Sequence, residues 1–459
     1  MTTSTSQNTH ETDTANNASC TTISTILTLA IPTFGQLIAE PAFVLIDTAI
    51  VGHIGGQALA GLSVGSTIVL TVVGLCVFLA YSTTSQVGRL LGAGKRREGL
   101  EAGVDGLWLA GIIGVVVSVA LFVIARPLCM AMGAQGSVLH NAVDYVRAVV
   151  FGIPGMLLVY AANGIFRGLQ KVRITLVAAT LGAILNTLLD LLFILGFGWG
   201  VFGSGVATLI SQWLMAVVLI VPAVLWTRAE GARLRPRLSG VLNSAGDGAV
   251  LFLRTLALRA CLVANVVLAT HMGVEVLAAY QVVNSSWNFV LNMLDAIGIA
   301  GQTLVAAQIG ARQEDEAMRL TRIAGKAGLC GGTVIGIGLM IAGWCASPLF
   351  SQSIEIQHLL TVGMVVVGVT LPLAGWMWAV DGILIGAGDY RYLALTCTAT
   401  AAIYVPCLAA IGWICDAMQA SSALRMALLW LAVNLLFVGL RAIFNGFRIG
   451  TSTWLHIAH

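Results

Sequence analysis

The chain has 459 residues, of which 58% are hydrophobic and only 9% are charged, and its net charge is +3. Average soluble domains carry about 25% charged residues, so this composition excludes a soluble fold. A membrane-spanning helix needs about 20 mostly apolar residues, and the chain therefore has room for roughly a dozen spans. The sequence predicts an all-α membrane protein with the lipid bilayer as its main surroundings.

The first segment, residues 1–22, is polar and lacks the basic start and apolar core of a secretory signal. Its composition is too polar to bury a core, so a disordered cytoplasmic tail is expected there. Another short tail is expected at residues 450–459.

Apolar runs separated by polar interruptions predict six spans in each half of the chain. The first lobe, 23–226, contains runs near 23–51, 57–87, 101–125, 138–166, 174–196 and 202–226. A polar, arginine-rich linker at 227–243 follows. The second lobe, 244–449, contains runs near 244–270, 275–308, 317–346, 356–387, 390–414 and 422–447.

Arginine and lysine set the expected orientation, because cytoplasmic loops carry an excess of them. They cluster after every second predicted span, whereas the opposite side has only Arg126, Arg147 and Arg425. Both termini and the central linker are therefore expected in the cytoplasm.

The two halves are related in sequence, which indicates an internal duplication. A shift of 218 residues lays Gly164-Ile-Phe on Gly382-Ile-Leu and His53-Ile-Gly on His271-Met-Gly. Because each half has an even number of spans, the halves should be related by an axis along the membrane normal. This is a transporter architecture with a cavity between its lobes.

Motifs for other functions are missing from the sequence. The run Gly198-x-Gly200-x-x-Gly203 matches a dinucleotide fingerprint only as a string, because no soluble βαβ unit surrounds it. The nine cysteines form no C-x-x-C pair, and no catalytic or phosphate-binding constellation is present. We expect no enzyme activity, organic cofactor or nucleic-acid partner, and a monomer that acts on a small molecule.

Acidic residues within predicted spans are the first candidates for function. A charge at the bilayer centre costs about 2.5–3.5 kcal/mol even on insertion scales, so such residues usually face a cavity. Glu40 and Asp47 share one face of the first helix, which has no lysine or arginine near Asp47. Mutual repulsion and burial favour the neutral form of at least one carboxyl, so this helix is predicted to carry protons or bind substrate.

Asn186 and Asp190 are spaced i, i+4 and therefore stack on one face of the fifth span. Together with Thr208 they offer oxygens that suit Na⁺, and the same atoms can hydrogen-bond a protonated carboxyl. Hydrogen bonding between helices is the alternative role. The sequence does not separate a proton from a sodium ion here.

Further candidates lie in the second half and at the start of the first helix. Asp295 and Asp381 are possible substrate or proton sites, although Asp381 also lies near the expected cytoplasmic interface. Trp376 and Trp378 are candidates for lining a cavity that binds flat apolar cations, which the faces of the aromatic rings attract. The alternative is a position at the membrane interface or facing lipid. Pro32 removes a backbone donor and predicts a bend that could couple protonation to gating.

Several segments together resemble the multidrug and toxic compound extrusion (MATE) family, in its DinF-like branch. They are LIDTAIVGHIG at 45–55, ALAGL at 58–62, GAGK at 92–95 and the Asn186-x-x-x-Asp190 pair. The resemblance implies twelve helices in two pseudo-symmetric six-helix bundles that form a V with a central cavity. It also implies a coupling cluster in the first lobe, made of Asp47, Asn186, Asp190, Thr208, Pro32 and Asn163.

The function that this resemblance implies is export of organic, often cationic, compounds in exchange for protons or sodium. The seventh span carries Arg254 and Arg259 but lacks the glutamate of the sister branch, which argues against a sodium site in the second lobe. A flippase for lipid-linked precursors is the alternative, and it would require a more cationic cavity. The expected location is the inner membrane of a bacterium.

Overall fold

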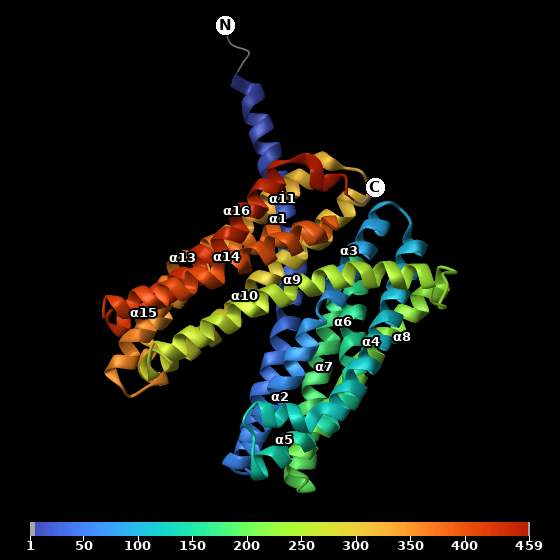
Figure 1. Cartoon of the computed structure of the whole chain (residues 1–459). Helices are drawn as coiled ribbons and strands as arrows, with labels where there is room; N and C mark the ends of the chain where they lie inside the picture. The colour runs from blue at the N-terminus through green and yellow to red at the C-terminus, as the bar shows by residue number, and fades with distance from the viewer. Residues whose placement is uncertain (1–4, 458–459) are drawn as a thin grey trace. The chain divides into compact units, whose positions relative to one another are not determined.

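The structure is a computed structural model that describes residues 5–457, without the side chains of residues 5–23, Glu40 and Phe43. All secondary structure in this described part is helical (Figure 1). The helices of six residues or more with α geometry are α1 Thr5–Gly52, α2 Gly56–Leu75, α3 Phe78–Gly92, α4 Arg96–Ala131, α5 Gly136–Val149, α6 Ile153–Gly168, α7 Val172–Asp190, α8 Gly200–Ala229, α9 Leu238–His271, α10 Val274–Gly310, α11 Glu314–Cys345, α13 Ile354–Ala387, α14 Tyr390–Ala417, α15 Ser422–Leu431 and α16 Gly439–Gly450. Twelve helical segments of the described chain are long and apolar enough to span a membrane, which confirms the predicted count.

Helix α1 differs from the sequence expectation at its beginning. The chain is helical from Thr5, within the segment for which a disordered tail is predicted. Residues 5–22 contain no glycine or proline that would end a helix, so the polar segment continues the apolar helix that follows it.

Several spans are interrupted, and one interruption has a clear cause. The fourth span consists of α5 and α6, joined by a 3₁₀ turn over Val150–Gly152. Pro154 has no backbone N–H to donate to the carbonyl of Val150, four residues earlier. The Ser118 hydroxyl of α4 donates to that carbonyl instead, so the break costs no unsatisfied acceptor.

The chain divides into two compact units at positions that the sequence does not reveal. The first unit is Pro32–Phe252, and the second contains the residues up to Ile31 together with Leu253–His459. The linker predicted at 227–243 does not contain the boundary between the two units. It is also shorter than predicted. The helices leave only residues 230–237 outside regular helix, and the boundary falls within α9.

A buried carboxylate of α4 holds the linker within the first unit. Glu101 forms ion pairs with the guanidinium groups of Arg97 at 3.5 Å, Arg233 at 3.4 Å and Arg237. Its side chain is only 7% exposed, while the three arginines are roughly half exposed. A carboxylate with several charged donors is held firmly, because charge-assisted hydrogen bonds are stronger than neutral ones.

Two more residues of α4 bind the linker backbone one and two turns further along. The Asp105 carboxylate accepts from the backbone N–H of Arg237 at 2.9 Å, and the Trp108 indole donates to the carbonyl of Leu234 at 3.1 Å. In the following helix, Asp247 accepts a hydrogen bond from Gln86 of α3 at 3.2 Å. The first half of α9 thus belongs to the first unit, in which α3, α4 and α6 pack together (Figure 1).

Replacing Glu101 should loosen the linker without disturbing the spans. A hydrogen bond to a charged group contributes about 1.5–3 kcal/mol, and each 1.4 kcal/mol changes an equilibrium about tenfold. We expect Glu101→Gln to accelerate tryptic cleavage within the linker by about tenfold, measured by the appearance of two half-chain fragments. Glu98→Gln is the matched control, because Glu98 is exposed and Lys95 is its one ion-pair partner among the described residues. Equal cleavage rates in the Glu101 variant and the wild type would refute the clamp.

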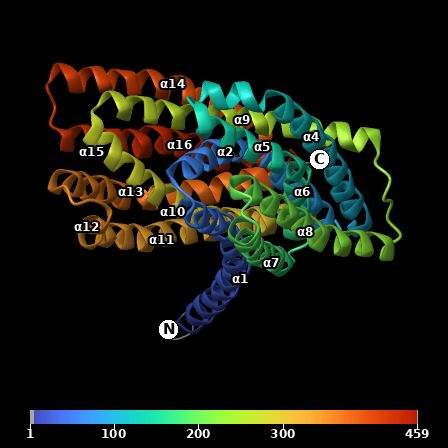
Figure 2. The same cartoon turned by 90° about the horizontal axis from the view of Figure 1, so that it is seen from below.

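In the second unit, α13 packs closely against α10 and α11 (Figure 2), and glycines lie where the helix backbones meet. A Cβ atom on Gly375 would lie 2.0 Å from the carbonyl oxygen of Gly328, and one on Gly382 would lie 2.3 Å from that of Gly298. Small residues allow such close backbone approach, on which helix association in membranes depends.

Gly375→Ala should therefore destabilise the second unit. The added methyl group meets backbone atoms rather than a side chain that can move, and overpacking of this kind costs about 1–3 kcal/mol. We expect a lower Tm in detergent by circular dichroism. Gly338→Ala is the control, because a Cβ at Gly338 meets no described atom within 4 Å. An unchanged Tm for Gly375→Ala would show that the helices separate at no cost.

Candidate functional site

The carboxylate of Asp47 lies inside the first unit, near the end of α1. It is buried, and one of its oxygens, Oδ1, accepts a hydrogen bond from the Ser204 hydroxyl of α8 at 2.7 Å. Sequence reasoning did not select Ser204, because a serine between two glycines in an apolar run carries no distinctive signal. The hydrogen bond fixes the orientation of Asp47 and leaves its other oxygen for a further partner.

Asn186 and Asp190 lie one turn apart at the end of α7, as their spacing predicts. The amide nitrogen of Asn186 donates to Oδ2 of Asp190 at 2.7 Å, and both side chains are buried. The amide oxygen of Asn186 and Oδ1 of Asp190 have no hydrogen-bond partner within the described part of the chain. Buried polar atoms normally have a hydrogen-bond partner, so these two oxygens are suited to binding a proton, a water molecule or a cation.

The two carboxylates belong to one electrostatic cluster. Asp47 and Asp190 lie close enough for their charges to interact. Tyr145 of α5 interacts with both carboxylates and lines the same cavity as Thr208 of α8. Within the described residues, neither carboxylate forms an ion pair with lysine or arginine. The structure thus brings together Asp47, Asp190 and Thr208, three members of the cluster that the family resemblance implies, and adds Tyr145.

A small cavity adjoins this cluster. The space within it that the centres of water molecules can occupy is about 20 Å³. Its lining residues include Asp47, Thr208, Tyr145 and Gln212. About 10–15 Å³ is enough for one water. Asp47 is the one acid among the described lining residues, so the cavity places a water-sized guest beside a carboxylate.

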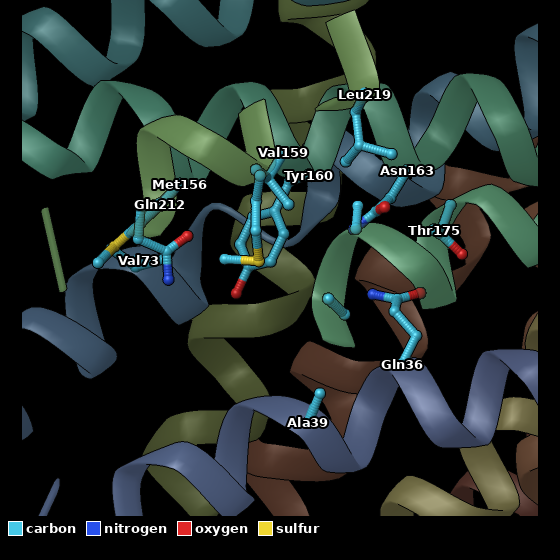
Figure 3. Close-up of a pocket in the computed structure, with 13 residues that line it drawn as sticks. Gln36, Ala39, Val73, Met156, Val159, Tyr160, Asn163, Thr175, Gln212 and Leu219 are labelled. Carbon is cyan, nitrogen blue, oxygen red and sulfur yellow. The ribbon is translucent and has the colours of Figure 1, made fainter. Parts of the chain in front are cut away.

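Asn163 lies in a second cavity of the same unit rather than beside Asp47. This cavity has about 50 Å³ for water centres, and Gln36, Asn163 and Thr175 converge on it from α1, α6 and α7 (Figure 3). The amide oxygen of Asn163 has no hydrogen-bond partner among the described residues. Met156 and Gln212 line both cavities, so the two spaces are neighbours.

Asp381 is engaged in a buried ion-pair cluster of the second unit. Its Oδ2 pairs with Arg254 of α9 and, at 3.1 Å, with Arg441 of α16, while its Oδ1 accepts from Asn445 at 3.2 Å. All four side chains are buried. This differs from the expected role in a substrate cavity, because both carboxylate oxygens already have partners.

The two tryptophans also pack inside the second unit. The Trp378 ring meets Trp287 edge to face at a centroid distance of 6.3 Å, and the Arg441 guanidinium lies 5.1 Å from its centroid. Trp376 packs against the apolar core and lies close to Gly325 and Gly446. The cation over Trp378 is thus a residue of the chain rather than a ligand.

The remaining candidates are less closely defined. Asp295 is half-buried on α10, and the side chain of Glu40 lies outside the described residues. Pro32 lies inside α1, where the first unit begins. No group of three or more histidine, cysteine or acidic side chains that could hold a metal occurs in the described part of the chain.

Asp381 is predicted to act on stability. Its removal would leave Arg254 and Arg441 buried without this counter-charge, and breaking a buried pair typically costs about 3–5 kcal/mol. We expect Asp381→Asn to lower the Tm by several degrees in detergent. Asp416→Asn should not, because Asp416 is 68% exposed where it pairs with Arg425. A variant at Asp381 with unchanged Tm but altered transport would contradict the structural role.

Comparison with known proteins agrees with this fold and duplication. The MatE family model matches residues 32–192 and 251–411, two segments whose starts agree within one residue with the 218-residue repeat. Protein DETOXIFICATION 44, chloroplastic, of Arabidopsis thaliana is 28% identical over 445 residues, covering 93% of this chain and 82% of that protein. DNA damage-inducible protein F of Escherichia coli K12 is 26% identical over 424 residues, covering 90% and 89%.

Solved structures show the same fold. The Vibrio cholerae MATE transporter VcmN in its bent form superposes with a TM-score of 0.85 at 18% identity, covering 96% of this chain and 99% of that chain. A MOP superfamily transporter of Pyrococcus furiosus gives a TM-score of 0.81 at 20% identity, covering 94% and 96%. The family model covers more than half of the sequence, and the chain therefore belongs to the MatE family of membrane transporters.

Proposed function

We propose that this protein exports organic cations by antiport with protons or sodium ions, through alternating access. The observation that carries the proposal is the pair of buried carboxylates, Asp47 and Asp190, which interact without an ion-pairing lysine or arginine among the described residues. Such a pair accepts a proton or a cation readily, because burial and mutual repulsion oppose two uncompensated negative charges. We place the protein in the inner membrane of a bacterium, as a monomer with both termini in the cytoplasm.

The exchange rests on competition for the same negative charge. An ionised Asp47, held by Ser204 through one oxygen, attracts the cationic substrate with the other. A proton arriving at Asp47 or Asp190 neutralises the site and releases the substrate. A sodium ion would use the free oxygens of Asn186 and Asp190 together with Thr208, since hard cations prefer oxygen ligands.

The gradients available to a cell are sufficient for this exchange. Each elementary charge that moves inward across about 100 mV supplies about 2.3 kcal/mol, and a transmembrane proton or sodium concentration difference adds to it. The chain has no segment that could house an ATPase, so the ion gradient is the energy source in this proposal.

Two further observations support the assignment to the first unit and to export. In the second unit Asp381 already has two arginine partners, so its charge is not available to a coupling ion. The relatives named DETOXIFICATION and the solved MATE transporters match nearly the whole chain. The alternative, a flippase for lipid-linked precursors, needs free cations in a cavity, whereas Arg254 is bound to Asp381.

Asp47→Asn should abolish coupled export while leaving the fold intact. Asparagine keeps the shape and can still accept from Ser204, but it cannot ionise. We expect efflux of a fluorescent organic cation from reconstituted vesicles to fall at least tenfold. Asp144→Asn in the same unit is the control, because Asp144 is 37% exposed and pairs only with His140 among the described contacts.

The vesicle experiment uses proton and sodium gradients imposed separately. Efflux driven by the proton gradient alone assigns proton coupling, and efflux driven by sodium alone assigns sodium coupling. Normal export by Asp47→Asn, or wild-type efflux that responds to neither gradient, would reject the antiport mechanism.

A further inference from the structure

The second cavity of the first unit has no role in the exchange just described. Its described lining combines alanine, valine and leucine side chains with amide, hydroxyl and thioether groups, and contains no formally charged side chain. The space open to the centres of water molecules is about 50 Å³. One water molecule needs about 10–15 Å³ of such space, so the cavity can hold a few. The buried amide oxygen of Asn163, which lacks a hydrogen-bond partner among the described residues, gives such water a place to bind.

The second cavity adjoins both the cavity of Asp47 and the hydrogen-bonded pair Gln36 and Arg167. On one side it shares Gln212 and Met156 with the cavity of Asp47. On the other side, Oε1 of Gln36 accepts a hydrogen bond from the Arg167 guanidinium at 2.8 Å. Arg167 lies one turn beyond Asn163 on α6, next to the turn into α7, and is only 4% exposed.

We propose that the two cavities form one hydrated route for the coupling proton through the first unit, and that Arg167, held by Gln36, closes its end against uncoupled cations. This inference rests on the proposed function, because it assumes that Asp47 exchanges the proton. It assigns Gln36 and Arg167, neither of which carries a role in the exchange itself, to the prevention of leak.

The charge of Arg167 explains how a narrow hydrated route can remain closed to free protons. Water molecules bridged by amides and hydroxyls can pass protons along a hydrogen-bonded chain, and a fixed positive charge raises the electrostatic barrier to them. Repulsion is strong because Arg167 is buried, and the low dielectric of a bundle interior screens charge poorly. Arginine remains protonated at all physiological pH values, so the barrier does not titrate away.

The position of Gln36 makes the closure responsive to helix α1. Gln36 follows Pro32 by one helical turn, and Pro32 is the residue at which the first unit begins. Asp47 lies three turns further along the same helix. A shift of α1 that accompanies protonation of Asp47 would therefore also move Gln36 relative to Arg167.

The test measures proton leak in the absence of substrate. Full-length protein is reconstituted into vesicles that contain a pH-sensitive dye. An outward potassium gradient with valinomycin makes the vesicle interior negative, which drives protons inward. We expect Arg167→Gln to raise proton entry about tenfold above the wild type. Arg173→Gln is the matched control, because Arg173 is an exposed arginine just beyond the same turn and should leave the leak unchanged.

Two double variants distinguish a defined route from a loosened protein. In the Arg167→Gln background, adding Asp47→Asn should remove the proton acceptor, and adding Asn163→Leu should fill the second cavity with an apolar group. Both should return the leak toward the wild-type rate. Gln36→Leu keeps Arg167 but removes its hydrogen-bond partner, and it should raise the leak above the wild type by less than Arg167→Gln does. It replaces Arg167→Gln as the test variant if that protein does not fold.

The outcomes separate this inference from the proposed function. A folded Arg167→Gln variant, or failing that Gln36→Leu, with no excess leak would overturn the route. So would a leak that persists in both double variants. If Asp47→Asn abolishes export while the leak experiment fails, only the route is refuted. If Asp47→Asn exports normally, the antiport mechanism itself is wrong.

Discussion

Two carboxylates, Asp47 and Asp190, lie inside a bundle of spanning helices without an ion-pairing arginine or lysine among the residues that the structure describes. Ionised acids in such surroundings are costly, and the surrounding polar groups offset only part of that cost. Ser204 supplies one hydrogen bond to Asp47, and Asn186 supplies one to Asp190. In the proposed mechanism, the remaining cost is what makes the site responsive to protons and cations.

The second unit meets the same physical problem in a different way. Asp381 is as deeply buried as Asp47, but Arg254 and Arg441 neutralise it permanently, and Arg441 also covers Trp378. A fixed ion pair is insensitive to the ions of the solution, whereas an uncompensated carboxylate responds to them. Duplication has therefore preserved the six-helix architecture in both halves, while the charges within them differ.

Much of the fold and part of the site could be predicted from the sequence. Twelve spans follow from hydropathy, and the Asn186–Asp190 contact follows from i, i+4 spacing, because both depend on local order. The partners of Asp381 could not be predicted, because Arg254 lies 127 residues away in sequence and only packing joins them. The contact of Ser204 with Asp47 could not be predicted for the same reason. Nor could the contacts between α4 and the linker, which place the linker in the first unit, so that the boundary between the units falls within α9.

Helix α1 connects these features physically. It contributes Gln36 to one cavity and Asp47 to the other, and the residues before Pro32 belong to the second unit. A continuous helix transmits displacement along its axis because every turn is hydrogen-bonded to the next, except where Pro32 lacks a donor. In the proposed mechanism, a change in the charge of Asp47 therefore acts on the same helix that contributes Gln36 to the second cavity.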